Sequence, residues 1–155
     1  MGLPTPQDPT PQPSTPTSTP ATPPKSPSHL PPAALDLASK LFDLARSGST
    51  APLSQYLLAG IPANLTNHSG DTLLMLASYH GHAATVRMLL ERGADPNVLN
   101  ERGQSPLAGA VFKGYGEVVG VLVGAGGDVW AGRPNAVETA GVFRRRDLLG
   151  VMGVE

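Results

Sequence analysis

His80 and His82 are the two residues whose type and spacing come closest to a reactive site. Imidazole is a common ligand of Zn²⁺, and protein zinc sites use three or four ligands. The sequence has no cysteine and offers no obvious third ligand for this pair, which stands across an expected helix end. We therefore expect a solvated or structural pair, without metal or cofactor. An enzymatic function remains an alternative only if a metal is bound at His80 and His82.

Other patterns of catalytic chemistry are also missing from the sequence. Without cysteine there is no thiol nucleophile, disulfide framework or zinc-thiolate site. The glycines from Gly124 to Gly127 end an expected helix, whereas a phosphate-binding loop would open one. No serine lies in a nucleophile-elbow pattern. We therefore expect a protein that is not an enzyme.

Residues 1–32 differ sharply in composition from the rest of the chain. They hold 12 prolines and 10 serines or threonines, with Asp8 and Lys25 as their charged residues. So little apolar surface cannot offset the roughly 1–2 kcal/mol per residue that ordering costs, which predicts a disordered tail. Its Thr-Pro steps would suit proline-directed phosphorylation, and Pro20, Pro23 and Lys25 match a ligand pattern for aromatic-lined grooves. A passive linker is the alternative.

The remaining residues, 33–155, repeat with a period of 33. A shift by that number places Gly70 on Gly103 and Leu74 on Leu107, and seven further pairs follow without a gap. The units are approximately 34–66, 67–99, 100–132 and 133–155, with the register of the last shortened to 30. A fixed period of this length is typical of solenoid proteins, so the folded part is expected to be one domain of about four units.

Each unit reads as two short helices. In the second unit, Thr72 can cap a helix that carries Leu73 and Leu74, and Gly81 ends that helix where a left-handed residue is needed. A second apolar helix follows and ends at Gly93. Helices of roughly 8–10 residues are unstable alone, so each pair must be covered by its neighbours. We expect an all-α solenoid of helix-turn-helix units behind the disordered tail.

These residues resemble the ankyrin repeats. The segment GDTLLMLASYHGHAATVRMLLERGADPN, from Gly70 to Asn97, follows that family's pattern, and GQSPLAGAVFKGY repeats it from Gly103. The resemblance implies that His82 is a structural histidine bonded to the neighbouring turn. Departures from the pattern are Leu73 at the helix-starting proline, Trp130 at the turn asparagine and Arg144 at the inter-helix glycine. Irregular turns are expected in the third and fourth units.

The ankyrin resemblance also implies an extended concave surface on which particular slots contact a partner. Tyr79 and Phe112 stand one repeat period apart at one such slot, and exposed aromatic residues are favoured at interface hot spots. Folding of both rings over the adjacent helix, as peripheral core, is the alternative. The predicted partner-binding residues are, in the second unit, His68, Ser69, Asp71, Tyr79 and His80 and, in the third, Glu101, Arg102, Gln104, Phe112 and Lys113.

Glycines in the third unit allow two interpretations. Gly116, Gly120 and Gly124 recur at every fourth position and form a small-residue stripe on the expected second helix. Such a stripe allows close approach by another helix. A degenerate outer surface under little constraint is the alternative, which we favour at this stage.

Charge distribution narrows the class of partner. Residues 33–155 carry 10 basic and 11 acidic side chains, interspersed along the sequence, so a nucleic-acid partner lacks its electrostatic footprint. No apolar run approaches the roughly 20 residues of a membrane span. We expect a monomer in the cytoplasm or the nucleus that binds another protein as an adaptor or scaffold. A regulatory inhibitor that occludes an enzyme's active surface is the alternative function.

Overall fold

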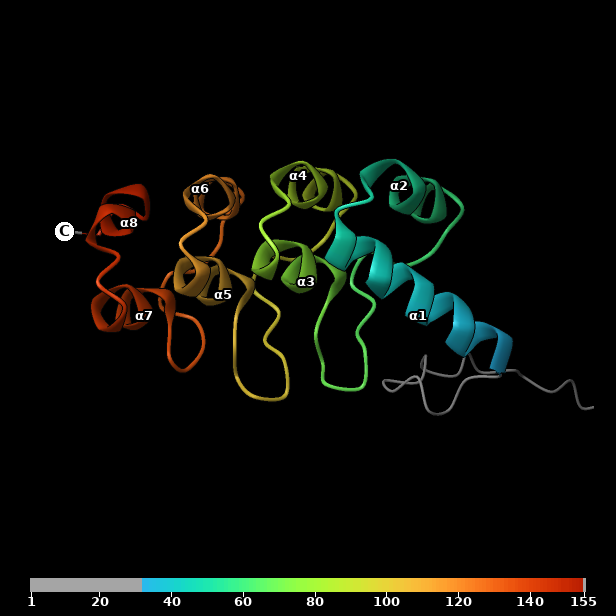
Figure 1. Cartoon of the computed structure of the whole chain (residues 1–155), viewed down its shortest axis with the longest axis horizontal. Coiled ribbons are helices and arrows are strands. Elements are labelled where there is room, and N and C mark those ends of the chain that lie inside the picture. Colours follow the sequence, from blue (N-terminus) through green and yellow to red (C-terminus); the bar gives the residue numbers. More distant parts are fainter. Residues whose placement is uncertain (1–31, 155) are drawn as a thin grey trace, which may run out of the picture.

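The computed structural model describes residues 32–154, and in this range the chain forms eight α-helices and no strand (Figure 1). The predicted disordered tail lies outside the described residues, apart from Pro32, where the first helix begins. The all-α solenoid is confirmed. The helices are α1 (Pro32–Ser47), α2 (Thr50–Leu58), α3 (Leu73–Tyr79), α4 (Ala83–Glu91), α5 (Pro106–Lys113), α6 (Gly116–Gly124), α7 (Ala136–Val142) and α8 (Arg146–Val151).

The helices stack in two rows. The odd-numbered helices form an inner row in which each contacts the next, and the even-numbered helices form an outer row beside it (Figure 1). Three connections extend from the outer row past the inner row and return (Figure 1). We call them fingers 1, 2 and 3, for residues 59–72, 92–105 and 125–135. None of the helices in the described range is long and apolar enough to span a membrane.

The core lies between the rows, and leucine and alanine are its most frequent residues. Leu53, Leu74, Leu89, Leu107 and Leu122 are fully buried, and each comes from a different helix. Seven of the eight helices have nine residues or fewer and would not persist in water alone. Their stability therefore depends on the apolar surface that neighbouring pairs cover. Helix α1 is longer than predicted, with 16 residues.

Capping side chains begin the inner helices α3, α5 and α7. The Thr72 hydroxyl accepts a hydrogen bond of 3.0 Å from the Met75 amide, as predicted, and Ser105 accepts the same bond from the Ala108 amide. Helix α7 begins with a reciprocal pair, in which Asn135 accepts from the Glu138 amide and Glu138 from the Asn135 amide. Such caps are typically worth about 1 kcal/mol each.

A column of positive-φ residues turns the chain between the two helices of each unit. Gly48, Gly81 and Gly114 have φ between 73° and 80°, and Arg144 takes this place in the fourth unit with φ 56°. The residue that follows each turn packs over the glycine of the preceding unit, so that a Cβ at Gly48 would lie 2.5 Å from the His82 ring. His82 Nε2 lies 2.7 Å from the Arg46 carbonyl oxygen. The structural role predicted for His82 is confirmed.

Two asparagines join the bases of successive fingers. Asn64 accepts from the Asp95 amide and donates to the Gly93 carbonyl, and Asn97 makes the same two bonds with Asp128 and Gly126. We call these bonds the asparagine clamps. Trp130 occupies the next position in the series and is 60% exposed. Its indole cannot accept an amide proton, so the series ends there.

The glycine stripe on α6 faces α8 of the same chain. A Cβ at Gly116 would lie 3.5 Å from Leu148, and one at Gly120 would lie 3.7 Å from Val151, whereas Gly124 faces open space. The stripe is therefore not the bare outer surface that we favoured. Helix α8 covers most of it.

Candidate binding groove

A groove of about 560 Å³ lies along the concave side of the stack, between the inner helices and the fingers. Its floor comes from α3, α5 and α7, one wall from fingers 1 to 3, and its first end from the end of α1. The lining residues are Arg46, Asp71, Met75, Leu76, Tyr79, His80, Asn100, Arg102, Gln104, Ser105, Ala108, Gly109, Phe112, Pro134, Thr139 and Phe143.

Three aromatic rings follow one another along the groove, and we call them the aromatic ladder. The Tyr79 and Phe112 rings stack with centroids 6.4 Å apart, and Phe143 meets Phe112 edge-on at 4.7 Å. Their exposed fractions are 40%, 39% and 47% in chain order. The rings therefore contact one another across units while keeping a large part of their surface in water, an arrangement between the two alternatives of buried core and free surface.

Register explains why Phe143 escaped the sequence prediction. Tyr79 and Phe112 lie two residues before a turn glycine, and so does Arg46 in the first unit. Arg144 takes the turn position in the fourth unit, so Val142 occupies the matching slot and is 72% exposed. Phe143 lies one residue later, at the slot of Lys113, yet its ring reaches Phe112. Helix register alone did not indicate that contact.

The floor of the groove contains a gap at Gly109. The matching position in the preceding unit is Leu76, and the matching position in the shortened fourth unit is Thr139, so a side chain flanks the gap on both sides. A Cβ at Gly109 would touch Tyr79 Cδ2 at 3.4 Å, and no other atom lies within 4 Å. We call this space the Gly109 hollow. It lies beside the aromatic ladder and was not predicted from the sequence.

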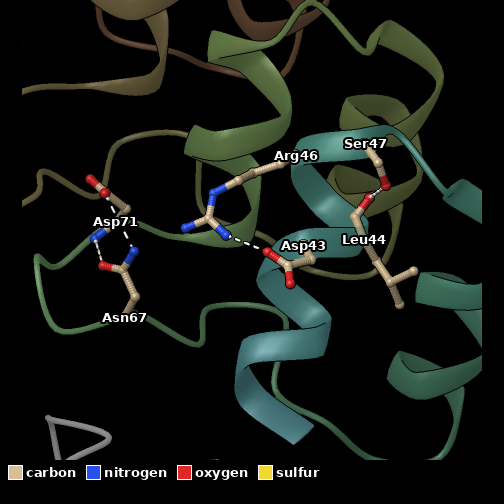
Figure 2. A network of polar contacts seen from close by, with 6 residues as sticks. All are labelled: Asp43, Leu44, Arg46, Ser47, Asn67 and Asp71. Carbon is tan, nitrogen blue, oxygen red and sulfur yellow. Dashed lines mark hydrogen bonds and ion pairs between the residues drawn. The ribbon is translucent and has the colours of Figure 1, made fainter. Parts of the chain in front are cut away.

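Asparagine side chains shape the finger wall. Asn100 Oδ1 accepts from the Arg102 and Gln104 amides, and its Nδ2 donates to Asp71 Oδ1 at 2.8 Å. Asn67 accepts from two amides of finger 1 in the same way and approaches Asp71 (Figure 2). These bonds fix the finger tips and join finger 1 to finger 2. Neither asparagine was predicted, although their separation by one repeat period was a usable signal.

Charged groups stand at the end of the groove formed by α1. Arg46 pairs with Asp43 at 2.8 Å and faces the finger that carries Asp71 (Figure 2). The pair is exposed and so contributes little to stability. Partial burial, followed by the nearby charges of His82, Arg46 and Lys113, lowers the pKa of His80. His80 is therefore neutral near pH 7 and presents an uncharged polar ring to the groove.

The predicted site residues fall into three groups. Asp71, Tyr79, His80, Arg102, Gln104 and Phe112 line the groove together. Lys113 lies against the Tyr79 ring, with Nζ 5.1 Å from the centroid. His68 lines a separate cavity of about 180 Å³ beside α1, while Ser69 and Glu101 join the fingers through their backbones at 3.0 Å and line neither cavity.

The two histidines do not form a chelating pair. Their ring centroids are 6.5 Å apart, the rings are nearly parallel, and His82 Nε2 faces the Arg46 carbonyl. Among residues 32–154, no group of three or more His, Cys, Asp or Glu side chains is placed to hold a metal ion.

A stack of helix pairs with a concave, aromatic-lined face defines a helical-repeat scaffold. A family model described as ankyrin repeats in three copies matches residues 41–132. The chain belongs to the ankyrin-repeat family, whose members generally act as protein–protein interaction modules. A protein of Pseudomonas aeruginosa named as an ankyrin repeat protein is similar, with 60% identity over 53 residues. That match covers 34% of this chain and 31% of the relative, so the two share less than a third of the relative's length.

Proposed function

We propose that the concave groove binds an extended segment of another protein and that the chain acts as a non-catalytic adaptor or scaffold. The aromatic ladder carries this proposal. Partly exposed aromatic rings supply large contact area at little conformational cost, and binding energy at interfaces concentrates on such residues. The Gly109 hollow beside the ladder would receive an apolar side chain of the partner.

Polar groups around the ladder would set the direction of the bound segment. Arg46 and Arg102 line the groove and favour a partner with carboxylates. The acidic Asp71 also lines the groove, but its carboxylate already accepts a hydrogen bond from the side-chain amide of Asn100. The proposed partner segment therefore combines apolar or aromatic side chains with acidic ones. Since acidic and basic residues are balanced over residues 33–155, we propose a protein partner in preference to nucleic acid. We also propose that the chain is a monomer.

Partner capture by the full chain tests the proposal. We expect the double variant Tyr79→Ala with Phe112→Ala to lose the captured partner. Tyr79 is 40% and Phe112 39% exposed, so their truncation also removes packing, and we expect a loss of stability of roughly 2–4 kcal/mol. Capture is therefore measured under conditions in which the variant is folded. The matched control is Leu58→Ala on α2, because Leu58 is 57% exposed in the outer row. We expect it to keep the partner.

Two results would contradict the proposed site. Equal loss of capture in the Leu58 variant would point away from the groove. Destabilisation of the double variant by about 6 kcal/mol or more, the sum for two fully buried aromatic residues, would identify the rings as peripheral core. A single stoichiometric enzyme partner whose activity falls when the chain is added would favour the alternative, a regulatory inhibitor.

A further inference from the structure

Residues 1–31 have the composition of a ligand for an aromatic-lined groove. They contain 11 prolines, and Asp8 and Lys25 are their charged residues. Proline-rich segments bind such grooves in the polyproline II conformation, in which little conformational entropy remains to be lost. The same chain therefore carries both an aromatic ladder and a segment of the chemistry that aromatic grooves recognise.

We propose that residues 4–16 of this chain bind in its own groove, with proline rings on the aromatic ladder and in the Gly109 hollow. The segment then competes with any partner for the same surface. This inference goes beyond the proposed function, because it assigns an occupant to the groove within the chain and makes that occupant a regulator of partner access.

The aromatic ladder leaves room for about one turn of polyproline II. The two measured centroid distances place Tyr79 and Phe143 no more than about 11 Å apart. A polyproline II turn has three residues and a length of about 9.3 Å, so prolines three positions apart lie on one face. Within residues 4–16, Pro6 with Pro9 and Pro13 with Pro16 have this spacing, and either pair can face the ladder. Pro20 with Pro23 and Pro24 with Pro27 share the spacing but have no acidic residue between them.

Charge favours the first of these pairs. Asp8 lies between Pro6 and Pro9 and is the acidic residue of the segment. Arg46 and Arg102 both line the groove. With Pro6 and Pro9 on the ladder, the Asp8 carboxylate would project toward one of these guanidinium groups, which form strong hydrogen bonds with carboxylates.

The structure offers a route from the segment's attachment point to the groove. Helix α1 begins at Pro32, on the side of the stack from which the fingers extend (Figure 1). A smaller cavity of about 180 Å³ lies along α1 between Leu35 and Arg46, and Phe42 contributes to its lining. Arg46 also lines the groove. Arg46 therefore lines both hollows, and a segment that follows the track from α1 to the groove would pass this residue.

The segment is long enough to follow that track. From Pro32 to Arg46 the helix rises by about 21 Å, and two further inner helices at about 10 Å each bring the total to roughly 40 Å. Polyproline II extends about 3.1 Å per residue, so about 13 residues cover this distance. Residues 4–16 lie beyond that number from Pro32 and can reach the ladder with slack.

Because the segment is covalently attached to the folded part, a weak affinity for the groove is enough to occupy it. Short flexible connections give effective concentrations in the millimolar range. An intrinsic dissociation constant of about 1 mM would then leave about half of the grooves occupied and would raise the apparent dissociation constant of a competing partner about twofold.

Paramagnetic relaxation in the full chain tests the proposal. The sequence has no cysteine, so Ser18→Cys provides a single position for a nitroxide label just outside the docked residues. We expect the label to broaden the amide signals of Gly109, Phe112 and Phe143 and to leave Leu58 on α2 unchanged. Replacing Pro6, Pro9, Pro13 and Pro16 by serine in the labelled chain is expected to remove the broadening.

A matched control replaces Pro23, Pro24 and Pro27 by serine and is expected to keep the broadening. Three results would overturn the proposal: uniform or absent broadening, broadening that survives loss of the four docking prolines, and broadening in a mixture of labelled chains and isotopically enriched, unlabelled chains. The last result would mean that the segment binds a second copy. Absent broadening in the labelled chain that keeps its prolines, together with intact partner capture, would refute this inference and leave the proposed function standing.

Discussion

Substitutions at Gly109 can test the stability of the stack and the shape of its groove one at a time. The residue lies inside α5, where glycine costs roughly 1 kcal/mol relative to alanine. A Cβ there meets Tyr79 Cδ2 at 3.4 Å, the limit of ordinary contact, so alanine fits with at most a small shift of the ring. We therefore expect Gly109→Ala to stabilise the protein by about 0.5–1 kcal/mol.

For a folded part of 123 residues, that gain corresponds to a rise in melting temperature of about 2–5 °C. Thermal and urea unfolding of the full chain measure it. Gly120→Ala on α6 is the matched control, because its Cβ would meet Val151 at 3.7 Å, outside the groove. The two alanine variants are expected to gain similar stability.

Gly109→Leu then tests the groove, since Leu76 shows that the slot accepts a leucine in the second unit. We expect this variant to fold and to lose whatever occupies the hollow. A Gly109→Ala variant less stable than wild type, beside a stabilised Gly120→Ala, would show that the hollow is already filled by the ladder. The reasoning on groove shape would then be wrong.

Three further predictions concern stability. Gly81→Ala combines a positive φ of 79° with a Cβ 3.0 Å from the Tyr115 ring, so we expect a loss of about 1–3 kcal/mol in urea unfolding; an unchanged midpoint would contradict this. Ser78 is fully buried and its hydroxyl has no hydrogen-bond partner among residues 32–154, so Ser78→Ala is expected to raise stability by about 1 kcal/mol, measured in the same way. Because the pKa of His80 is lower in the folded state, the unfolded chain takes up its proton first as pH falls below about 6.5, and stability falls with it. His80→Gln is expected to flatten stability between pH 7 and pH 5, and an unchanged slope would refute the assignment.

The repeat itself could be predicted because it is local in sequence. Thr72 as a cap, Gly81 as a turn and Gly93 as a helix end each follow from a few neighbouring residues. The same signals recur from unit to unit, which fixes the stack once one unit is understood. Even Arg144 in a glycine position could be identified, and it indeed has a positive φ.

The groove was harder to predict because its contacts join side chains from different units, far apart in the sequence. Tyr79 and Phe112 were identified by their slot, but the edge-on contact of Phe143 depends on the angle at which α7 leaves its turn. The hydrogen bond from Asn100 to Asp71 depends on how closely two fingers approach. The Gly109 hollow can be recognised only when the side chains of Leu76 and Thr139 are placed on either side of Gly109. The role of these residues in binding a partner stays a prediction.

The asparagine clamps affect how cooperatively the units of the stack unfold. In a linear array, cooperativity is set by the free energy of each interface between neighbours. The first three units are joined in pairs by Asn64 and Asn97, whereas Trp130 leaves the third and fourth units without that bond. The third and fourth units therefore lack a bond that the earlier pairs have, and we expect the fourth unit to open more readily than it would with an asparagine at position 130. Because Phe143 belongs to that unit, such an opening would remove one rung of the aromatic ladder and change what the groove can hold.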